Sequence, residues 1–518
     1  MALGVVVLSF VYRLPPLLNA GDTNSDAAIV GLQAMHILHG EFSWLLFGST
    51  YQTSVDSTVA ALWFLVLGAT PLALMLSALV GHVILTLLAY GTLRHESGAV
   101  LGAGESSSPS PHLSKMAAAL VVLPLIFCAA PVHGNALYPP RQAALTLVFV
   151  SIFLLEGIAT SRHALLRAAA GGAVALLACF GDPYALVFLP LVGLHLILAS
   201  RGALGPWLRR IGAGLAGMAA GAVPLALLLA SPNSRHGETK MSARVVSHNF
   251  DVLREACLPW VMGTKVYAPL HEMDYVPWHA PPAGVAIQWV GALALVALLA
   301  GSVVVVLAPE TPWGVRRLGS VGLLSVPLTL GAFLLSPMVM DHFSARYLVS
   351  MLLFLPFALA PIAHRLASPR FAVCVAPYLA SAAIGGWVAY GPAVDGFAIR
   401  TGLSRDDEIM GEKLRALGVH VAMADYWVAY REAFLFHEDP IVIPSHAAQD
   451  RYRAYREVFG REGEYAYLLD RWRSEEPESA VVGRLVLSGA RYDRIEVGDL
   501  VAFVVHAPPA KTPGLASR

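Results

Sequence analysis

Long apolar segments recur along most of the chain and are separated by short polar loops. The first runs from Met1 to Leu18, with Arg13 and the Pro15–Pro16 pair near its end. A hydrocarbon core about 30 Å thick needs about 20 apolar residues per helix. Further spans are predicted near residues 71–93, 114–130, 141–158, 168–182, 184–199, 211–230, 285–308, 318–336, 347–364 and 371–390. The pattern therefore predicts a polytopic α-helical membrane protein with about eleven transmembrane helices.

The pattern changes completely after residue 394. Helices are predicted at 406–417, 425–436 and 449–459, and strands at 419–423, 441–443 and 465–469, with a strand pair between 492 and 506. Alternating strands and helices indicate a small α/β domain. We therefore expect a transmembrane domain at 1–394 and a soluble α/β domain at 395–507. The tail at 508–518, rich in Pro, Ala and Ser, is expected to be disordered.

Two long polar loops, 19–70 and 231–284, interrupt the apolar segments. In the first, Ile29, Leu32 and Met35 recur at helical spacing behind Ser25 and Asp26, which are cap-forming residues. This pattern predicts a helix that lies in the plane of the membrane interface. A second helix is predicted from residue 53 to residue 67. Long loops outside a membrane often carry function.

Basic residues lie in alternate short loops. Lys and Arg in short loops are retained on the cytoplasmic side. One set of loops contains Arg94, Lys115, Arg162, Arg167, Arg201, Arg209, Arg210, Arg316, Arg317, Arg365 and Arg370, and the other set contains Arg141 and Arg346. The asymmetry predicts a cytoplasmic N-terminus and an extracytoplasmic C-terminal domain, on the same side as loops 19–70 and 231–284.

Composition supports the membrane class and excludes others. Hydrophobic residues make up 56% of the chain and charged residues 14%, whereas soluble proteins contain about 25% charged residues. The mean hydropathy is +0.62. The formal net charge is zero, so no nucleic-acid partner is indicated. The four cysteines form no CxxC or Cys/His pattern, so neither a disulfide framework nor a zinc finger is expected.

Several motifs together point to one family. The first outer loop contains SDAAIVGLQAMHILHGE at 25–41, then Phe47-Gly48-Ser49-Thr50-Tyr51, Val55-Asp56 and Ala60-Ala61. Ala345-Arg346-Tyr347-Leu348 begins a later span, and ADYWVAYR occupies 424–431. These residues resemble bacterial GT-C glycosyltransferases, the polyprenyl-phosphate-sugar-dependent enzymes related to protein O-mannosyltransferases and the lipid A aminoarabinose transferase. The resemblance covers most of the chain and implies a bacterial inner (plasma) membrane protein.

The resemblance also implies a mechanism. Asp26 matches the loop acid of the family and would be the general base for an acceptor hydroxyl, a role that typically contributes about 10²–10⁴-fold in rate. Attack opposite the phosphate would invert the anomeric centre. Arg346, with Arg141 and Tyr347, would bind the donor phosphate through charge-assisted hydrogen bonds. Asp22, Tyr51 and Asp56 are candidates for the acceptor side of the loop. The implied partners are a polyprenyl-phosphate-linked sugar donor, a lipid, glycan or protein acceptor, and membrane lipid.

Each of these residues also has a simpler structural interpretation. Asp26 could cap the interfacial helix, Arg346 could reach the interface as a snorkelling side chain, and Tyr347 could anchor the same interface. Arg141 could be an ordinary helix-end residue, and Asp182 a turn former. Aromatic residues at Tyr426, Trp427 and Tyr430, with Arg431, could stack on a glycan or form a packed face. Polar and aromatic residues of the middle outer loop, such as His248, Asp251, His271, Glu272, Asp274 and His279, are open to the same two readings.

The chain departs from the family at two places. Ala27 stands where a second acid often follows the loop acid, and residues 131–141 contain no acid. A divalent metal is therefore weakly supported, because a hard cation needs several oxygen ligands. A catalytically degenerate membrane subunit is one alternative. A lipid-linked sugar flippase is the other, although transporters usually place polar residues in mid-span.

Overall fold

The computed structural model describes residues 1–97, 110–128, 130–230, 242–271, 274–389, 401–461 and 464–506. Within them, six helical segments are long and apolar enough to cross a membrane. They are α5 (Pro71–Arg94), α9 (Ala164–Gly181), α11 (Leu204–Gly221) with α12 (Val223–Leu229), α15 (Pro282–Leu307), α16 (Trp313–Leu334) and α19 (Ser368–Ala389). A bent pair adds a seventh if it counts as one span: η4 (His342–Leu348) with α17 (Val349–Leu353), followed by α18 (Leu355–Arg365), at an angle of 42°.

Shorter apolar helices lie at the other predicted spans. These are α1 (Ala2–Tyr12), α6 (Lys115–Ile126), α8 (Gln142–Leu155), and η2 (Pro183–Phe188) continued by α10 (Leu189–Ala199). Proline shortens the first, because α1 gives way to α2 (Leu14–Leu18), which begins with Pro15 and Pro16. The structure therefore establishes a multi-pass helical bundle with six or seven spans by length and composition. The number eleven remains a prediction.

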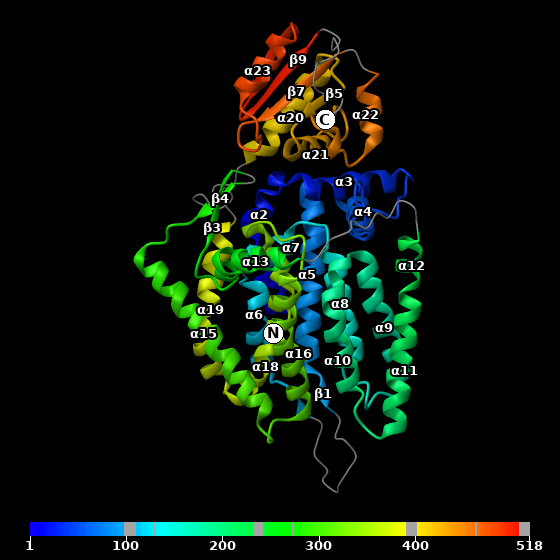
Figure 1. Ribbon diagram of the computed structural model, residues 1–518, viewed down its shortest axis with the longest axis vertical. Coiled ribbons are helices and arrows are strands. Elements are labelled where there is room, and N and C mark those ends of the chain that lie inside the picture. The colour runs from blue at the N-terminus through cyan, green and yellow to red at the C-terminus, as the bar shows by residue number, and fades with distance from the viewer. Residues whose placement is uncertain are drawn as a thin grey trace.

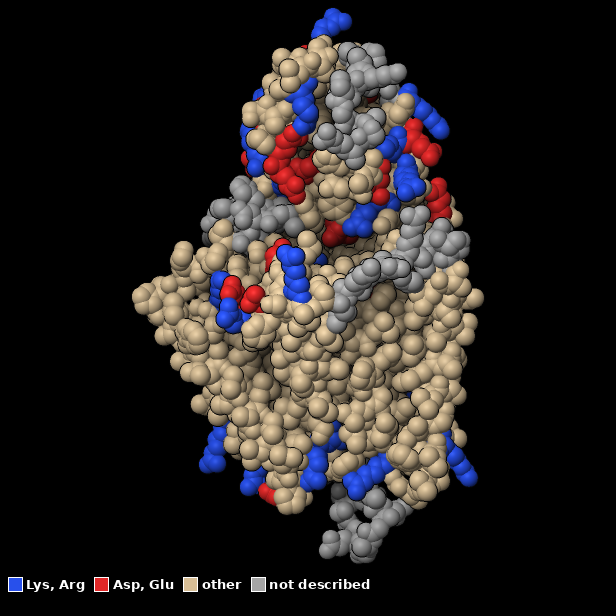
Figure 2. All heavy atoms as spheres, in the orientation of Figure 1, with Lys and Arg blue, Asp and Glu red and all other residues tan. Residues whose placement is uncertain are grey.

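Shorter elements cover one end of this bundle. They are η1 (Ala20–Asp22), α3 (Ser25–Leu38), α4 (Val55–Leu67), α7 (Ala130–Leu137), α13 (Ala243–Val252), the π-helical η3 (Leu253–Cys257), α14 (Leu258–Val261), β3 (Tyr267–His271) and β4 (Asp274–Pro277). Two short strands, β1 (Glu96–Ser97) and β2 (Ser110–Pro111), lie at the other end. In Figure 1, α3 runs across the ends of the long helices. Figure 2 shows that the visible face of the bundle is a broad uncharged band between two charged ends.

The C-terminal part forms a five-stranded mixed sheet with helices against it. Its elements are α20 (Thr401–Ala416), β5 (Val421–Ala424), α21 (Tyr426–Leu435), β6 (Ile441–Pro444), η6 (Ala447–Gln449), α22 (Arg453–Phe459), β7 (Tyr465–Asp470), α23 (Glu478–Leu487), β8 (Tyr492–Val497) and β9 (Leu500–Val505). The strand order is β6-β5-β7-β9-β8, with β5 parallel to β6 and β7 and with β9 antiparallel to β7 and β8. The predicted strands lie within a few residues of these positions, whereas α23 is not predicted. The predicted boundary at 395 and the tail at 508–518 lie outside the described residues.

Helices α3 and α4 share a hydrophobic core with the C-terminal sheet. Ile29, Leu32 and Met35 of α3 are buried in one cluster with α21 and the strands. The Phe64 ring of α4 stacks on Phe434 of α21 at 6.0 Å. The apolar residues of α3 are therefore covered by protein, not by lipid as the interfacial-helix prediction implied. The C-terminal part is held directly against the outer loop (Figure 1).

Candidate functional site

Asp26 lies in the first turn of α3, but it does not cap this helix. The cap is Asn24, whose side chain accepts a hydrogen bond of 2.9 Å from the backbone N–H of Ala27. The capping interpretation of Asp26 is therefore wrong, because the helix begins at Ser25, two residues earlier than an Asp26 cap requires. The Asp26 carboxylate instead points to the C-terminal part, and its side chain is 45% exposed.

Two residues of the C-terminal part hold one oxygen of Asp26. The Tyr426 hydroxyl donates a hydrogen bond of 2.5 Å to Asp26 Oδ1, and the Arg451 guanidinium lies 3.6 Å from the same oxygen. Arg451 also donates to the Tyr426 hydroxyl through Nε and Nη2, at 3.1 and 3.0 Å. Burial and the Asp26 carboxylate raise the pKa of the Tyr426 hydroxyl, so it stays protonated and remains a donor. In the described part of the chain, no hydrogen bond reaches Asp26 Oδ2.

Close backbone contacts fix Arg451 and Tyr426 in these positions. Gly48 has a φ of +65°, and a Cβ atom there would lie 2.5 Å from Arg451 Cα. Glycine is needed at this point because it tolerates both the left-handed backbone and the close approach. On the other side, the Ser25 hydroxyl reaches the Tyr426 carbonyl at 2.7 Å, and Arg431 donates to the Gly21 carbonyl at 2.8 Å. The first outer loop and α21 are therefore fastened to each other around Asp26.

The Tyr51 hydroxyl feels charged groups from both the Asp26 region and a second polar group around Arg141. The Tyr51 side chain is 42% exposed. Partial burial and the Asp182 carboxylate raise the pKa of its hydroxyl, while Arg141 and Arg451 lower it, and the Tyr347 hydroxyl raises it again. Groups from four distant segments thus act on one hydroxyl. Figure 2 shows the surface hollowed between the helical bundle and the C-terminal part, with acidic and basic side chains beside the hollow.

The second polar group consists of Arg141 and two buried carboxylates, Asp182 and Asp56. Arg141 Nε donates to Asp182 Oδ2 at 2.9 Å, and its guanidinium lies over the Tyr184 ring at 4.7 Å. Asp182 also accepts from Gln52 at 3.1 Å and caps η2 by accepting from the Tyr184 N–H. Asp182 is therefore a turn former, as predicted, and in addition the ion-pair partner of Arg141.

Asp56 is buried, and its carboxylate is committed to the start of α8. Its two oxygens accept the backbone N–H groups of Arg141 and Ala143, each at 2.9 Å. Arg141 itself has a φ of 113°, a left-handed conformation that this carboxylate holds in place. Asp56 thus positions Arg141.

Arg346 and Tyr347 lie at the end of η4. The Arg346 side chain is exposed, and its guanidinium lies over the Tyr347 ring at 5.2 Å. The Tyr184 hydroxyl donates to the Tyr347 carbonyl at 3.2 Å, which joins this pair to Arg141. Within the described residues, Arg346 has no acidic partner, unlike Arg141 and Arg451.

The structure brings most of the predicted site residues together. Asp26 contacts Tyr426 and Arg451, and Arg451 donates to the Gly48 carbonyl of the first outer loop. From the same loop Gln52 donates to Asp182, the partner of Arg141. Contacts continue from Arg141 through Tyr184 to Tyr347 and Arg346. Asp22 ends η1 and its side chain is not described, as is also the case for His271 and Asp274; Glu272 lies outside the described residues. Sequence reasoning missed Arg451, Tyr184 and Gln52, because no motif marks them and folding alone places them here.

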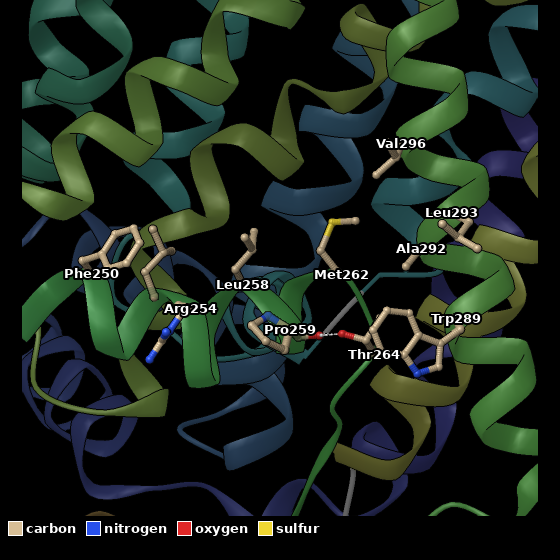
Figure 3. Close-up of a pocket in the computed structure, with 11 residues that line it drawn as sticks. Phe250, Arg254, Leu258, Pro259, Met262, Thr264, Trp289, Ala292, Leu293 and Val296 are labelled. Atoms are coloured by element: carbon tan, nitrogen blue, oxygen red, sulfur yellow. Dashed lines mark hydrogen bonds between the residues drawn. The ribbon is translucent and has the colours of Figure 1, made fainter.

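An apolar groove of about 430 Å³ opens on the side of the bundle. It lies between the loop helices α13 and α14 and the long helix α15 (Figure 3). Its lining includes Phe250, Leu258, Met262, Trp289, Leu293 and Val296, with Arg254 at the edge. The same loop helices pack against η4, because the Trp260 ring lies 5.9 Å from the His342 ring. The groove and Arg346 therefore lie on connected elements.

Comparisons with known proteins give the following results. No protein-family model matches the chain, and no curated protein matches it. The structure is similar to that of ArnT from Cupriavidus metallidurans in the apo state, with a TM-score of 0.45 and 12% identity over 97% of this chain and 98% of that chain. For the same enzyme bound to undecaprenyl phosphate, the TM-score is 0.45 and the identity 12%, over 99% of this chain and 98% of that chain. For the apo Archaeoglobus fulgidus oligosaccharyltransferase, the TM-score is 0.46 and the identity 11%, over 86% of this chain and 64% of that chain. ArnT is the lipid A aminoarabinose transferase, one of the enzymes related to the GT-C family that the sequence resembles.

Proposed function

We propose that the chain is a membrane glycosyltransferase that moves a sugar from a polyprenyl-phosphate donor to an acceptor hydroxyl. The observation that carries the proposal is the Asp26 carboxylate, which has one oxygen held by Tyr426 and Arg451. The loop residues Gly48 and Gln52 link this carboxylate to the cationic Arg141 through Arg451 and Asp182. The donor class follows from the residues of the first outer loop that resemble polyprenyl-phosphate-dependent enzymes.

Asp26 acts as the general base in this proposal. A hydroxyl acceptor has a pKa far above 7, so it becomes a good nucleophile only if its proton is accepted during attack. The Oδ1 atom is held by Tyr426, which orients the carboxylate and leaves Oδ2 to take the proton. Attack on the anomeric carbon from the side opposite the phosphate forms the new glycosidic bond, expels the lipid phosphate, and inverts the configuration.

Arg346 binds the leaving phosphate. It is exposed and has no acidic partner among the described residues. One donor, Nη2, reaches the Tyr347 hydroxyl at 3.4 Å, and the others are available to a phosphate group. Arg141 is already paired with Asp182, and it contributes positive charge behind the site instead of a direct fork. Tyr347 supports the Arg346 guanidinium through its ring. Stabilising the charge that develops on the phosphate lowers the barrier to its departure.

The apolar groove between α14 and α15 takes the first prenyl units of the donor. Its lining is almost entirely apolar, and its edge carries Arg254. An apolar chain that is seated there would leave its phosphate close to the loop elements that support η4. Such a seat also allows the donor to enter sideways from the bilayer, without passing through water.

The experiment is substitution of Asp26 by Asn in membranes supplied with a radiolabelled polyprenyl-phosphate sugar. Asp26→Asn keeps the shape and removes the base, so transfer is expected to fall by about 10²–10⁴-fold while the protein level stays unchanged. Asp499→Asn, which changes an exposed carboxylate in the turn between β8 and β9, serves as the matched control and should leave transfer unchanged.

The same assay separates the enzyme from the flippase and from a degenerate subunit. A flippase would move the labelled lipid between leaflets without forming a glycosylated product. Unchanged transfer in Asp26→Asn removes Asp26 as the base, and absence of transfer in the wild-type protein with every acceptor class removes the transferase proposal.

A further inference from the structure

A cluster of buried titratable side chains lies at the opposite end of the bundle from Asp26. It contains Glu156 at the end of α8, His95 after α5, His112 before α6, and His195 of α10. Glu156, His112 and His195 are almost fully buried. The proposed transferase chemistry uses none of them, so their burial needs another explanation.

Ligand atoms of three of these residues come close together. One ligand atom each from His95, His112 and Glu156 lie within 4.8 Å of one another. His112 Nε2 is 3.0 Å from Glu156 Oε1, and His195 Nε2 is 3.4 Å from the other oxygen, Oε2. In a tetrahedral site with bonds of about 2.0–2.1 Å, ligand atoms are about 3.3 Å apart. The three residues are therefore near enough to share one metal ion, with small shifts of the side chains.

Two glycines make room for the imidazole rings. A Cβ atom on Gly157 would lie 2.1 Å from His95 Cε1, and Gly157 has a φ of +66°. A Cβ atom on Gly314 would lie 2.0 Å from His112 Cε1. Any side chain at either position would push a ring away from Glu156. The rings are thus seated by the backbone.

Several buried polar atoms in the cluster lack a hydrogen-bond partner among the described residues. They are His95 Nδ1, both ring nitrogens of His195, and Glu156 Oε2, which faces His195 Nε2. An unsatisfied buried polar atom costs about 1–3 kcal/mol. A metal ion held by His95 and Glu156 would give such atoms a partner.

We propose that His95, His112 and Glu156 form a binding site for a divalent transition metal, with Zn²⁺ as the best match. Imidazole and carboxylate are preferred zinc ligands, and three of them leave one position of a tetrahedral site for water. The site joins the ends of α5 and α8 with the segment before α6, so a bound metal would hold these segments together.

Arg317 determines which oxygen of Glu156 is available to the metal. Its guanidinium forms an ion pair with Glu156 Oε1. This pair leaves Oε2 as the oxygen for the metal and orients the carboxylate, as outer-shell partners of metal ligands do. The same positive charge opposes a dication, so the metal should be removable by a strong chelator.

The test is metal analysis of the purified full chain in detergent. After chelator treatment and reloading, we expect about one Zn²⁺ per chain by mass spectrometry, and visible absorption of four-coordinate Co²⁺ when cobalt replaces zinc. His112→Ala and the milder His95→Ala, which removes a half-buried ring, should each lose the cobalt band. His248→Ala changes an exposed histidine on α13 and should keep it.

Each outcome decides the proposal. If the wild-type protein binds no stoichiometric Zn²⁺ or Co²⁺, the site does not exist, and this result does not depend on the folding of any variant. Retention of the cobalt band in both His95→Ala and His112→Ala would place the metal elsewhere and would equally overturn the proposal.

Discussion

At the residue scale, the charged groups of the site are of two kinds. Engaged groups are bound to other groups of the protein, and available groups keep atoms that a substrate can reach. Asp56 and Asp182 are buried and bound to Arg141 or its backbone, while Asp26 and Arg346 keep exposed atoms. The engaged groups hold the loops in place, and the available groups are the ones that can meet a substrate. This division explains why several acids in one loop can have different roles.

The first residue-scale prediction concerns Arg346. Arg346→Gln should raise the KM for the lipid donor by roughly 10–100-fold, because a hydrogen bond to a charged group contributes about 1.5–3 kcal/mol. Arg346→Lys keeps the charge but loses the planar fork, so its effect should be smaller. The measurement is donor-dependent transfer in proteoliposomes. Arg244→Gln, an exposed arginine of α13, is the control. Equal KM values for the wild type and Arg346→Gln would assign the phosphate to another group.

A second residue-scale prediction concerns the contact between α3 and the C-terminal part. His36 Nε2 lies 2.7 Å from Glu438, and Nδ1 lies 2.6 Å from Glu41. The hydrogen bond to Glu438, with a smaller contribution from Glu41, raises the pKa of His36 above 6.5 despite burial. Because the folded-state pKa is raised, the contact stabilises the fold fully below pH 6.5. This stabilisation is lost as the pH rises through the folded-state value.

His36→Gln should therefore lower the free energy of unfolding by about 1 kcal/mol at pH 6. The contribution of Glu41 to this value is small, because its side chain is largely exposed and solvent screens the pair. The difference from the wild type should vanish at high pH. The measurement is the unfolding temperature in detergent as a function of pH. Parallel curves for the two proteins would show that His36 does not titrate with this contact.

Sequence reasoning reached only part of the residue scale. Asp26, Arg141 and Arg346 could be proposed because they carry charge in outer loops beside apolar spans. Arg451 and Tyr426 could not be assigned to Asp26, since 400 residues separate Tyr426 from Asp26 and no periodicity encodes that contact. The cap of α3 was misplaced because Asn24, Ser25 and Asp26 are all good capping residues in sequence.

At the scale of elements, the loop between α3 and α4 is shaped by glycines with distinct roles. Gly40 and Gly48 both have positive φ values, of 88° and 65°, but a Cβ atom at Gly40 would meet nothing within 4 Å. Gly40→Ala should cost about 1 kcal/mol of stability from backbone strain alone. Gly48→Ala should cost about 1–3 kcal/mol more, because Arg451 must move to avoid overpacking.

Transfer activity gives a second readout for this pair. Gly48→Ala should reduce transfer along with stability, since displaced Arg451 no longer holds Asp26, whereas Gly40→Ala should leave transfer close to the wild-type rate. Equal losses of stability and activity in both variants would show that the Gly48–Arg451 contact does not determine the site.

Helices were easier to predict than their surroundings. Apolar runs located the long helices, and the alternating pattern located the strands of the C-terminal sheet. The covering of α3 could not be predicted, because an apolar helix face looks the same in sequence whether lipid or protein covers it. The α23 helix was missed because Gly483 and the β-branched Val481, Val482 and Val486 are weak helix formers.

At the scale of the whole molecule, the C-terminal part depends on the first outer loop for its core. Phe434 packs on Phe64, and a Cβ atom on Gly31 would lie 2.7 Å from the Phe434 ring. A fragment of residues 401–506 would expose these apolar contacts to water. Each large side chain left exposed costs about 1.5–3 kcal/mol, and domains have only about 5–15 kcal/mol of stability.

This fragment should therefore lack a cooperative unfolding transition and should bind a hydrophobic dye. The measurement is chemical denaturation followed by circular dichroism, with the full chain in detergent as the comparison. A sharp transition in the fragment, at the denaturant concentration of the full chain, would show that the sheet is an independent unit.

The sharing of one core by the two ends of the chain has a consequence for biosynthesis. The ribosome makes Asp26 early, and Tyr426 follows 400 residues later. At about 5–20 residues per second, roughly 20–80 seconds pass before the partner of Asp26 exists. During that interval α3 is uncovered, and a protein that assists folding has time to bind it. A chain that ends before residue 426 also lacks the Tyr426–Asp26 contact, so under the proposed function Asp26 is oriented only after Tyr426 has been made.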